Sequence, residues 1–112
     1  MNVMVFRALA DPNRFGIVEL LKEGSLPVGI IAERLELSQP QTSKHLRVLA
    51  EAGLVQVEPS ANKRIYQLRT VPLQELETWL QTYRRMWEEK FDNLDDYLHQ
   101  LQQVDNNKDH KE

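Results

Sequence analysis

The side chains best suited to chemistry lie between residues 38 and 69, and they suit recognition of a polyanion. Gln39 and Gln41 could each hydrogen-bond a base edge in a paired fashion, and Ser43 and Lys44 could reach base edges or phosphate groups. Five basic residues against two acidic ones give this segment a local charge of +3, although the whole chain has a net charge of −3. The charged residues of the segment are Lys44, Arg47, Lys63, Arg64 and Arg69 against Glu51 and Glu58.

A helix predicted over residues 39–52 would present these side chains. Ser38, followed by Pro40 and by Gln41 three residues on, is typical of a capped helix start, and Gly53 suits the left-handed position that ends helices. If Leu46 faces the core, a rotation of about 100° per residue decides the other faces. Thr42, Leu49, Ala50 and Gly53 then turn inward, Pro40, Gln41, Lys44, Val48 and Glu51 turn outward, and Ser43, His45 and Arg47 lie on the flanks.

The elements around this helix predict the fold class. Short helices are expected over residues 3–10, over 12–21 with Asp11 as N-cap and Gly24 as the stop, and over 28–35. Alternating runs at 54–57 and 64–68 predict a hairpin, and a long helix follows from Val71. The expected architecture is mainly α with a β-hairpin wing (α+β), in the order ααααββα. Residues 1–104 would form a single domain and 105–112 a polar flexible tail.

Helix, short turn, helix and two-stranded hairpin is the order of a winged helix-turn-helix, whose second helix enters the DNA major groove while the wing contacts the flanking backbone. The sequence therefore predicts binding of double-stranded operator DNA through helix 39–52 and wing 59–64. The residues predicted to bind DNA are Gln39, Gln41, Thr42, Ser43, Lys44, His45, Arg47, Lys63 and Arg64.

The long helix carries an apolar seam at heptad spacing, interrupted by Lys90. Some thirty residues at about 1.5 Å each span roughly 50 Å, more than a small domain covers with its own core. We therefore expect a homodimer, with a helix folded onto its own domain as the alternative. The residues predicted at the dimer contact are Phe6, Leu76, Leu80, Tyr83, Trp87 and Leu94.

Composition removes several other classes of function. The 112 residues contain no cysteine, so thiolate nucleophiles, disulfides and thiolate metal sites are absent. No apolar run is long enough for a membrane span and no signal peptide is visible, which predicts a cytoplasmic protein. His45 has no cysteine partner, and the acidic run around Glu88 and Asp92 is typical of a solvated helix face. We expect no enzyme, no catalytic residue and no cofactor.

Five segments give a specific resemblance to the ArsR type of bacterial winged-helix repressor. They are residues 8–14 (ALADPNR), 17–21 (IVELL), 31–35 (IAERL), 37–49 (LSQPQTSKHLRVL) and 51–55 (EAGLV). The resemblance implies a homodimeric, operator-binding repressor in which Gln39 to Arg47 read DNA and Lys63 and Arg64 lie in the wing. Residues 83–96 (YRRMWEEKFDNLDD) resemble a cysteine-free subgroup with a long last helix.

The chain departs from the family at both of its metal sites. Metal-sensing members carry a Cys-x-Cys-Asp pattern where this chain has Pro27 to Ile30, so sensing of soft metals such as arsenite lacks its ligands. The second family site uses Asp, His and carboxylate ligands on the last helix. Tyr97 stands where the family places Asp, so we expect a solvated helix end and no metal. The residues that partly imitate that site are Asp95, Asp96, His99, His110 and Glu112.

One alternative keeps the same fold without the same ligand. A winged-helix protein-interaction module that does not bind DNA would be consistent with the overall acidity of the chain. The concentration of Lys44, Arg47, Lys63 and Arg64 in the two elements that should face DNA favours the DNA-binding prediction. A gel shift measured over a range of salt concentrations discriminates between the two.

Overall fold

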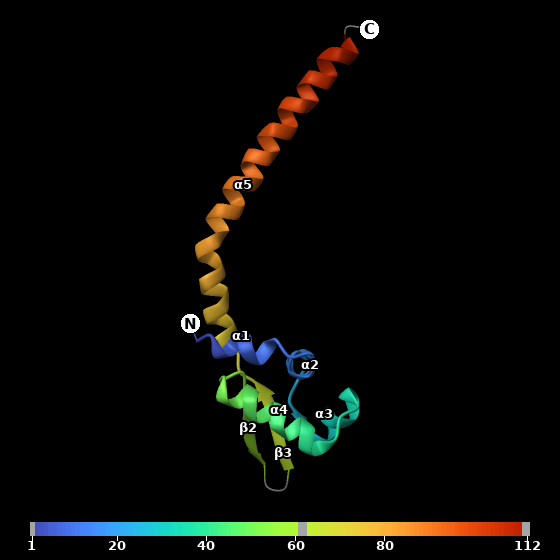
Figure 1. The fold of residues 1–112 in the computed structure, drawn as a ribbon, viewed down its shortest axis with the longest axis vertical. Coiled ribbons are helices and arrows are strands. Elements are labelled where there is room, and N and C mark those ends of the chain that lie inside the picture. The colour runs from blue at the N-terminus through green and yellow to red at the C-terminus, as the bar shows by residue number, and fades with distance from the viewer. Residues whose placement is uncertain (1, 61–62, 111–112) are drawn as a thin grey trace. The chain divides into compact units, whose positions relative to one another are not determined.

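The computed structural model describes the backbone of residues 2–60 and 63–110, and the side chains of these residues except 59, 60, 63 and 104–110. The chain divides into two compact units, one ending at Leu76 and the other beginning at Glu77. Figure 1 shows the elements α1 Met4–Leu9, α2 Pro12–Leu21, β1 Leu26–Pro27, α3 Val28–Leu35, α4 Gln39–Glu51, β2 Val55–Ser60, β3 Lys63–Leu68 and α5 Val71–His110.

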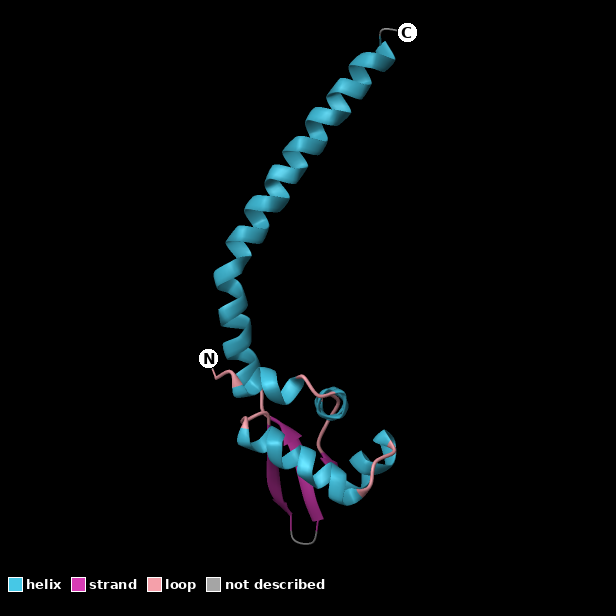
Figure 2. Cartoon of the chain, in the orientation of Figure 1, coloured by secondary structure: helices cyan, strands magenta, loops and turns pink. Residues whose placement is uncertain are grey.

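The first unit combines four short helices with a small antiparallel sheet, in the strand order β1-β3-β2 (Figure 2). Strands β2 and β3 form the predicted hairpin, from the pair Val55 and Leu68 at its base to the pair Ser60 and Lys63. Strand β1 pairs with β3 through Leu26 and Tyr66. The sequence did not predict β1, because two residues are too few to show the alternation that marks a strand. The predicted fold class is confirmed, with β1 added.

A single hydrophobic core joins these elements. Ile17, Ile31, Leu46, Leu49 and Leu54 are completely buried, and they come from α2, α3, α4 and the turn that leads into β2. Val5 and Ala8 of α1 and Tyr66 of β3 close the same cluster. Helix α4 is thus fixed from several sides along one face, which determines what its other face can present to a ligand.

Two tight connections set the directions of α4 and of the segments around it. Glu36 ends α3 in the left-handed conformation (φ 56°, ψ 42°), which is uncommon for a residue with a side chain. Gly53 follows α4 with φ 79°, where glycine carries no such cost. The first connection joins the two helices of the helix-turn-helix, and the second turns the chain from α4 into the hairpin.

Helix α5 begins at Val71 as predicted but continues to His110, beyond the predicted end at Val104. Leu73 packs against the core of the first unit. From Glu77 to Gln103 every residue is exposed. The division into a domain 1–104 and a flexible tail 105–112 stays a prediction. Over the described residues, no helix combines the length and apolar character that crossing a membrane requires.

Candidate nucleic-acid interface

The buried side of α4 consists of Thr42, Leu46 and Leu49, each with an exposed fraction of 0%. Thr42 was predicted both to turn inward and to contact DNA, and its use as a DNA contact is wrong. Its hydroxyl is inside the protein and donates a hydrogen bond to the Ser38 carbonyl oxygen at 2.9 Å. The buried face is centred between Leu46 and Leu49, which also explains why Ala50, predicted inward, is exposed.

The predicted capping box at the start of α4 is confirmed. The Gln41 backbone N–H donates to Ser38 Oγ at 3.2 Å, and the Ser38 backbone N–H donates to Gln41 Oε1 at 3.2 Å. This exchange satisfies two backbone donors that a helix start leaves without partners. The Ser38 hydroxyl donates to the same Gln41 Oε1 at 3.1 Å, so both acceptor sites of this oxygen are used and only the amide nitrogen remains available for a base edge.

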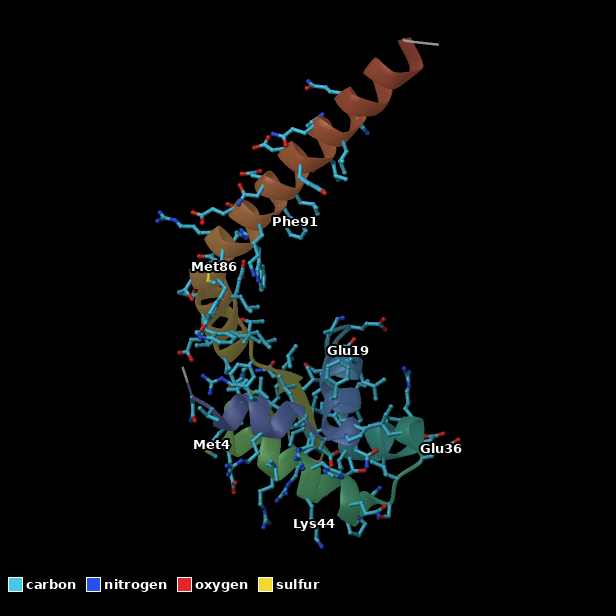
Figure 3. The ribbon with its side chains drawn as sticks, turned by 45° about the horizontal axis from the view of Figure 1, so that its top comes forward. Met4, Glu19, Glu36, Lys44, Met86 and Phe91 are labelled. Carbon is cyan, nitrogen blue, oxygen red and sulfur yellow. The ribbon has the colours of Figure 1, made fainter. Side chains whose placement is uncertain are left out.

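Exposed polar side chains cover the opposite side of α4. Gln41, Ser43, Lys44 and Arg47 are all exposed, and Figure 3 shows Lys44 on the side of the helix away from α1 and α2. Val48 lies one turn after Lys44 and is 36% exposed. The helical pattern predicted that Val48 faces outward, but no function was predicted for it. An apolar group at this position could contact the methyl group of thymine.

Gln39 is exposed but lies close to α3. A Cβ placed on Gly29 would be 3.3 Å from Gln39 Nε2, so the amide rests against the first turn of α3. Reading a base would require this side chain to swing outward, which its exposure permits.

His45 faces the protein more than solvent. It is half-buried and lies near enough to Asp11, the N-cap of α2, to contribute to the lowered pKa of that carboxyl group. The Arg14 backbone N–H is the main group that lowers the pKa of Asp11, and the Asn13 N–H and the charges of Arg14 and His45 act in the same direction against partial desolvation. The His45 ring thus lies at the edge between α4 and α2, where it borders the exposed face.

Arg14 holds α1 against α2, a role that was not predicted from the sequence. Its Nε donates to the Ala8 carbonyl at 2.8 Å and a terminal nitrogen donates to the Arg7 carbonyl at 3.3 Å, so it ties the end of α1 to α2. The sequence feature that could have drawn attention to Arg14 is its position three residues after Asp11, the N-cap of α2.

The wing contributes one described basic side chain. Arg64 is exposed on β3, where its backbone pairs with that of Pro59. Lys63 begins β3, and its side chain lies outside the described residues. The hairpin borders α4 through contacts between α4 and β2, so the helix and the wing belong to one compact unit.

The residues predicted at the dimer contact carry exposed apolar surface, apart from the half-buried Leu76. The exposed fractions are 38% for Phe6 and Leu80, 39% for Tyr83, and 50% for Trp87 and Leu94. The Trp79 and Tyr83 rings pack edge to face on α5 with centroids 5.1 Å apart.

Metal-binding groups do not gather in the part of the chain that the structure describes: no three His, Asp or Glu side chains there could hold one ion. Asp95, Asp96 and His99 lie on the exposed helix α5. The side chain of His110 and the whole of Glu112 lie outside the described residues.

Comparison with known proteins gives a consistent result. Residues 11–57 match the bacterial regulatory protein, arsR family. The HTH-type transcriptional regulator Rv2034 of Mycobacterium tuberculosis is 44% identical over 78 residues, which cover 70% of this chain and 73% of that protein. The transcriptional repressor SdpR of Bacillus subtilis is 37% identical over 76 residues, which cover 68% of this chain and 84% of that protein.

A solved structure has the same fold. The solution structure of a homodimeric winged helix-turn-helix DNA-binding domain from Mycobacterium bovis, a possible ArsR-family regulator, has a TM-score of 0.61 and 25% sequence identity. The match covers 78% of this chain and 81% of that domain. The chain has the winged helix-turn-helix fold and belongs to the ArsR family of bacterial regulatory proteins.

Proposed function

We propose that this chain is a homodimeric transcriptional repressor that binds a palindromic operator in the cytoplasm through α4 and the wing. The observation that carries the proposal is the division of α4 into two faces. Thr42, Leu46 and Leu49 fix the helix in the core, and the opposite face presents amide, hydroxyl, ammonium and guanidinium groups to solvent. A rigid helix with such an exposed face fits the major groove of DNA.

The roles of the individual side chains follow from their chemistry. Lys44, Arg47 and the wing residues Lys63 and Arg64 would neutralise phosphates and hold the protein in register. The Gln41 amide nitrogen, Ser43 and Val48 would meet base edges. Gln39 would join them after swinging away from Gly29, and His45 would contact the backbone at the edge of the groove.

A second copy is part of the proposal because one α4 can occupy only one half-site. Two recognition helices about 34 Å apart would reach successive major grooves, and an operator with matching symmetry is an imperfect palindrome. The homodimeric relative from Mycobacterium bovis supports this assembly. Since the chain has no cysteine, we propose that arsenite, antimonite and cadmium do not release it from DNA.

A gel shift of the full chain on the DNA upstream of its own coding sequence tests the proposal. We expect a shifted band that random DNA of equal length competes away only at a large excess. Ser43→Ala should weaken specific binding by about 1 kcal/mol or more and leave binding to random DNA nearly unchanged. Equal affinity of the wild-type chain for both DNAs would contradict an operator-binding function, and no binding at all would favour a protein-interaction module.

A further inference from the structure

The apolar seam of α5 is continuous if its spacing changes once. At strict heptad spacing, Lys90 falls inside the seam. If the next seam position lies four residues after Trp87 instead of three, Phe91 takes the place of Lys90 and every seam position from there to Leu101 is apolar. Such an insertion of four residues is a known local change in coiled-coil seams. The resulting seam is Leu73, Leu76, Leu80, Tyr83, Trp87, Phe91, Leu94, Leu98 and Leu101.

The surface of α5 is hollowed where the spacing changes. Trp87, Lys90, Phe91 and Leu94 line a depression of about 380 Å³. These residues stand at positions i, i+3, i+4 and i+7, the four positions that form a hole for a side chain of a facing helix. The depression therefore has the form that a second helix requires.

The apolar side chains that line this depression are highly exposed in the single chain, which indicates that a partner covers them. Phe91 is 65% exposed and Trp87 and Leu94 are each 50% exposed, and Figure 3 labels Phe91 on the free surface of α5. Aromatic and aliphatic groups gathered in one stripe at such exposure mark a contact surface.

The charged residues beside the seam favour a second copy of the same helix in parallel orientation. With the changed spacing, Lys90 directly precedes the seam residue Phe91, and Asp95 directly follows the seam residue Leu94. In two parallel helices in register, a residue that directly precedes such a seam position faces the residue five places later on the other helix. Lys90 of each copy would then face Asp95 of the other, so the stripe is complementary to itself.

We propose that residues 87–101 of α5 pair with the same residues of a second copy, parallel and in register, with Phe91 seated in the hole formed by Trp87, Lys90, Phe91 and Leu94. The pairing rests on the proposed homodimer and specifies its distal contact. Parallel helices also keep both N-terminal ends of the pair, to which the two winged units are attached, at the same end, so both units can address one DNA duplex.

Cysteine cross-linking tests whether the two α5 helices are parallel. Because the natural chain contains no cysteine, each variant carries a single reactive thiol. In a parallel pair in register, Leu94 and Leu101 each lie opposite themselves. Leu94→Cys and Leu101→Cys should therefore both form disulfide-linked dimers of the full chain under mild oxidation. Asp92→Cys, on the outer side of the helix, is the matched control and should remain largely monomeric on a non-reducing gel. Cross-linking of only one of the two leucine variants, or equal cross-linking of all three, would overturn the proposal.

Charge reversal tests the partner. Lys90→Glu or Asp95→Lys alone should raise the dimer dissociation constant about tenfold at low salt, because two facing pairs become repulsive. The double variant K90E/D95K, and an equimolar mixture of the two single variants, should recover wild-type affinity. Asp92→Lys should have little effect. Failure of both recoveries would show that the stripe does not pair in this way.

The pairing and the proposed function can fail separately. A chain that dimerises and binds its operator, yet shows neither the cross-linking pattern nor the charge recovery, would refute only the parallel pairing. A chain that is monomeric in sedimentation and leaves its upstream DNA unbound would refute the homodimeric repressor itself.

Discussion

Ser38 and Ser43 are exposed serines five residues apart with different surroundings. The Ser38 hydroxyl accepts the Gln41 backbone N–H, so Ser38→Ala should lower the free energy of unfolding by about 1 kcal/mol. Ser43→Ala changes an exposed position within the helix and should alter stability by less than about 0.5 kcal/mol. Urea denaturation of both variants measures this difference. Equal losses would mean that the capping box does not stabilise α4.

Asp11 makes the stability of the first unit depend on pH. Its pKa is lowered in the folded chain, mainly by the Arg14 backbone N–H, so its contribution is present above the unfolded pKa and lost as the pH falls through the folded pKa. Asp11→Asn keeps a side-chain oxygen for capping and removes the charge.

The wild-type chain should therefore be more stable than the Asp11→Asn variant near pH 6, and the difference should shrink as the pH falls from about 5 to about 3. Chemical denaturation of both chains across this range is the measurement. A difference independent of pH would show that the Asp11 charge contributes nothing.

The turn between α3 and α4 contains backbone strain that one substitution can relieve. Glu36 adopts φ 56°, whereas Glu33 lies inside helix α3 (Figure 3 labels Glu36). Glu36→Gly should raise the free energy of unfolding by about 0.5 to 1 kcal/mol, and the matched control Glu33→Gly should lower it by about 1 kcal/mol. Thermal unfolding ranks the three chains. Destabilisation by both substitutions would show that the Glu36 side chain makes contacts worth more than its backbone costs.

Local signals made most elements predictable from sequence. The capped starts at Asp11 and Ser38 and the glycine after α4 act over a few residues, and each lies where the sequence placed it. Strand β1 was missed because only pairing with Tyr66, forty positions away in the chain, makes it a strand.

The candidate site was less predictable than the elements that carry it. The angle of Thr42 from Leu46 already placed it inside, but its hydroxyl suggested a polar contact. The occupied oxygen of Gln41 and the position of the Gln39 amide against Gly29 depend on side-chain conformations that residue spacing does not determine.

A substitution of Trp87 tests whether α5 holds two copies of the chain together. Trp87→Glu would place a charge in the apolar seam, and burying an unpaired charge is strongly unfavourable. Sedimentation should show monomers, and operator affinity should fall with the dimer population. Because Trp87 is exposed in the single chain, the fold of each subunit should be retained in circular dichroism. A variant that stays dimeric with normal operator affinity would move the contact elsewhere, with Phe6 on α1 as the next candidate.

The salt dependence of operator binding shows directly whether α4 and the wing hold phosphate groups. Four basic residues from each of two copies would neutralise about six to eight phosphates, so the logarithm of the binding constant should fall against the logarithm of salt concentration with a slope of roughly −5 to −7. Fluorescence anisotropy with labelled operator measures this slope. Lys44→Ala should make the slope shallower by about 2, one phosphate for each copy. Lys22→Ala, which removes an exposed lysine that caps the end of α2 and pairs with Glu19, should leave the slope unchanged. A wild-type slope near zero would contradict DNA binding through α4 and the wing.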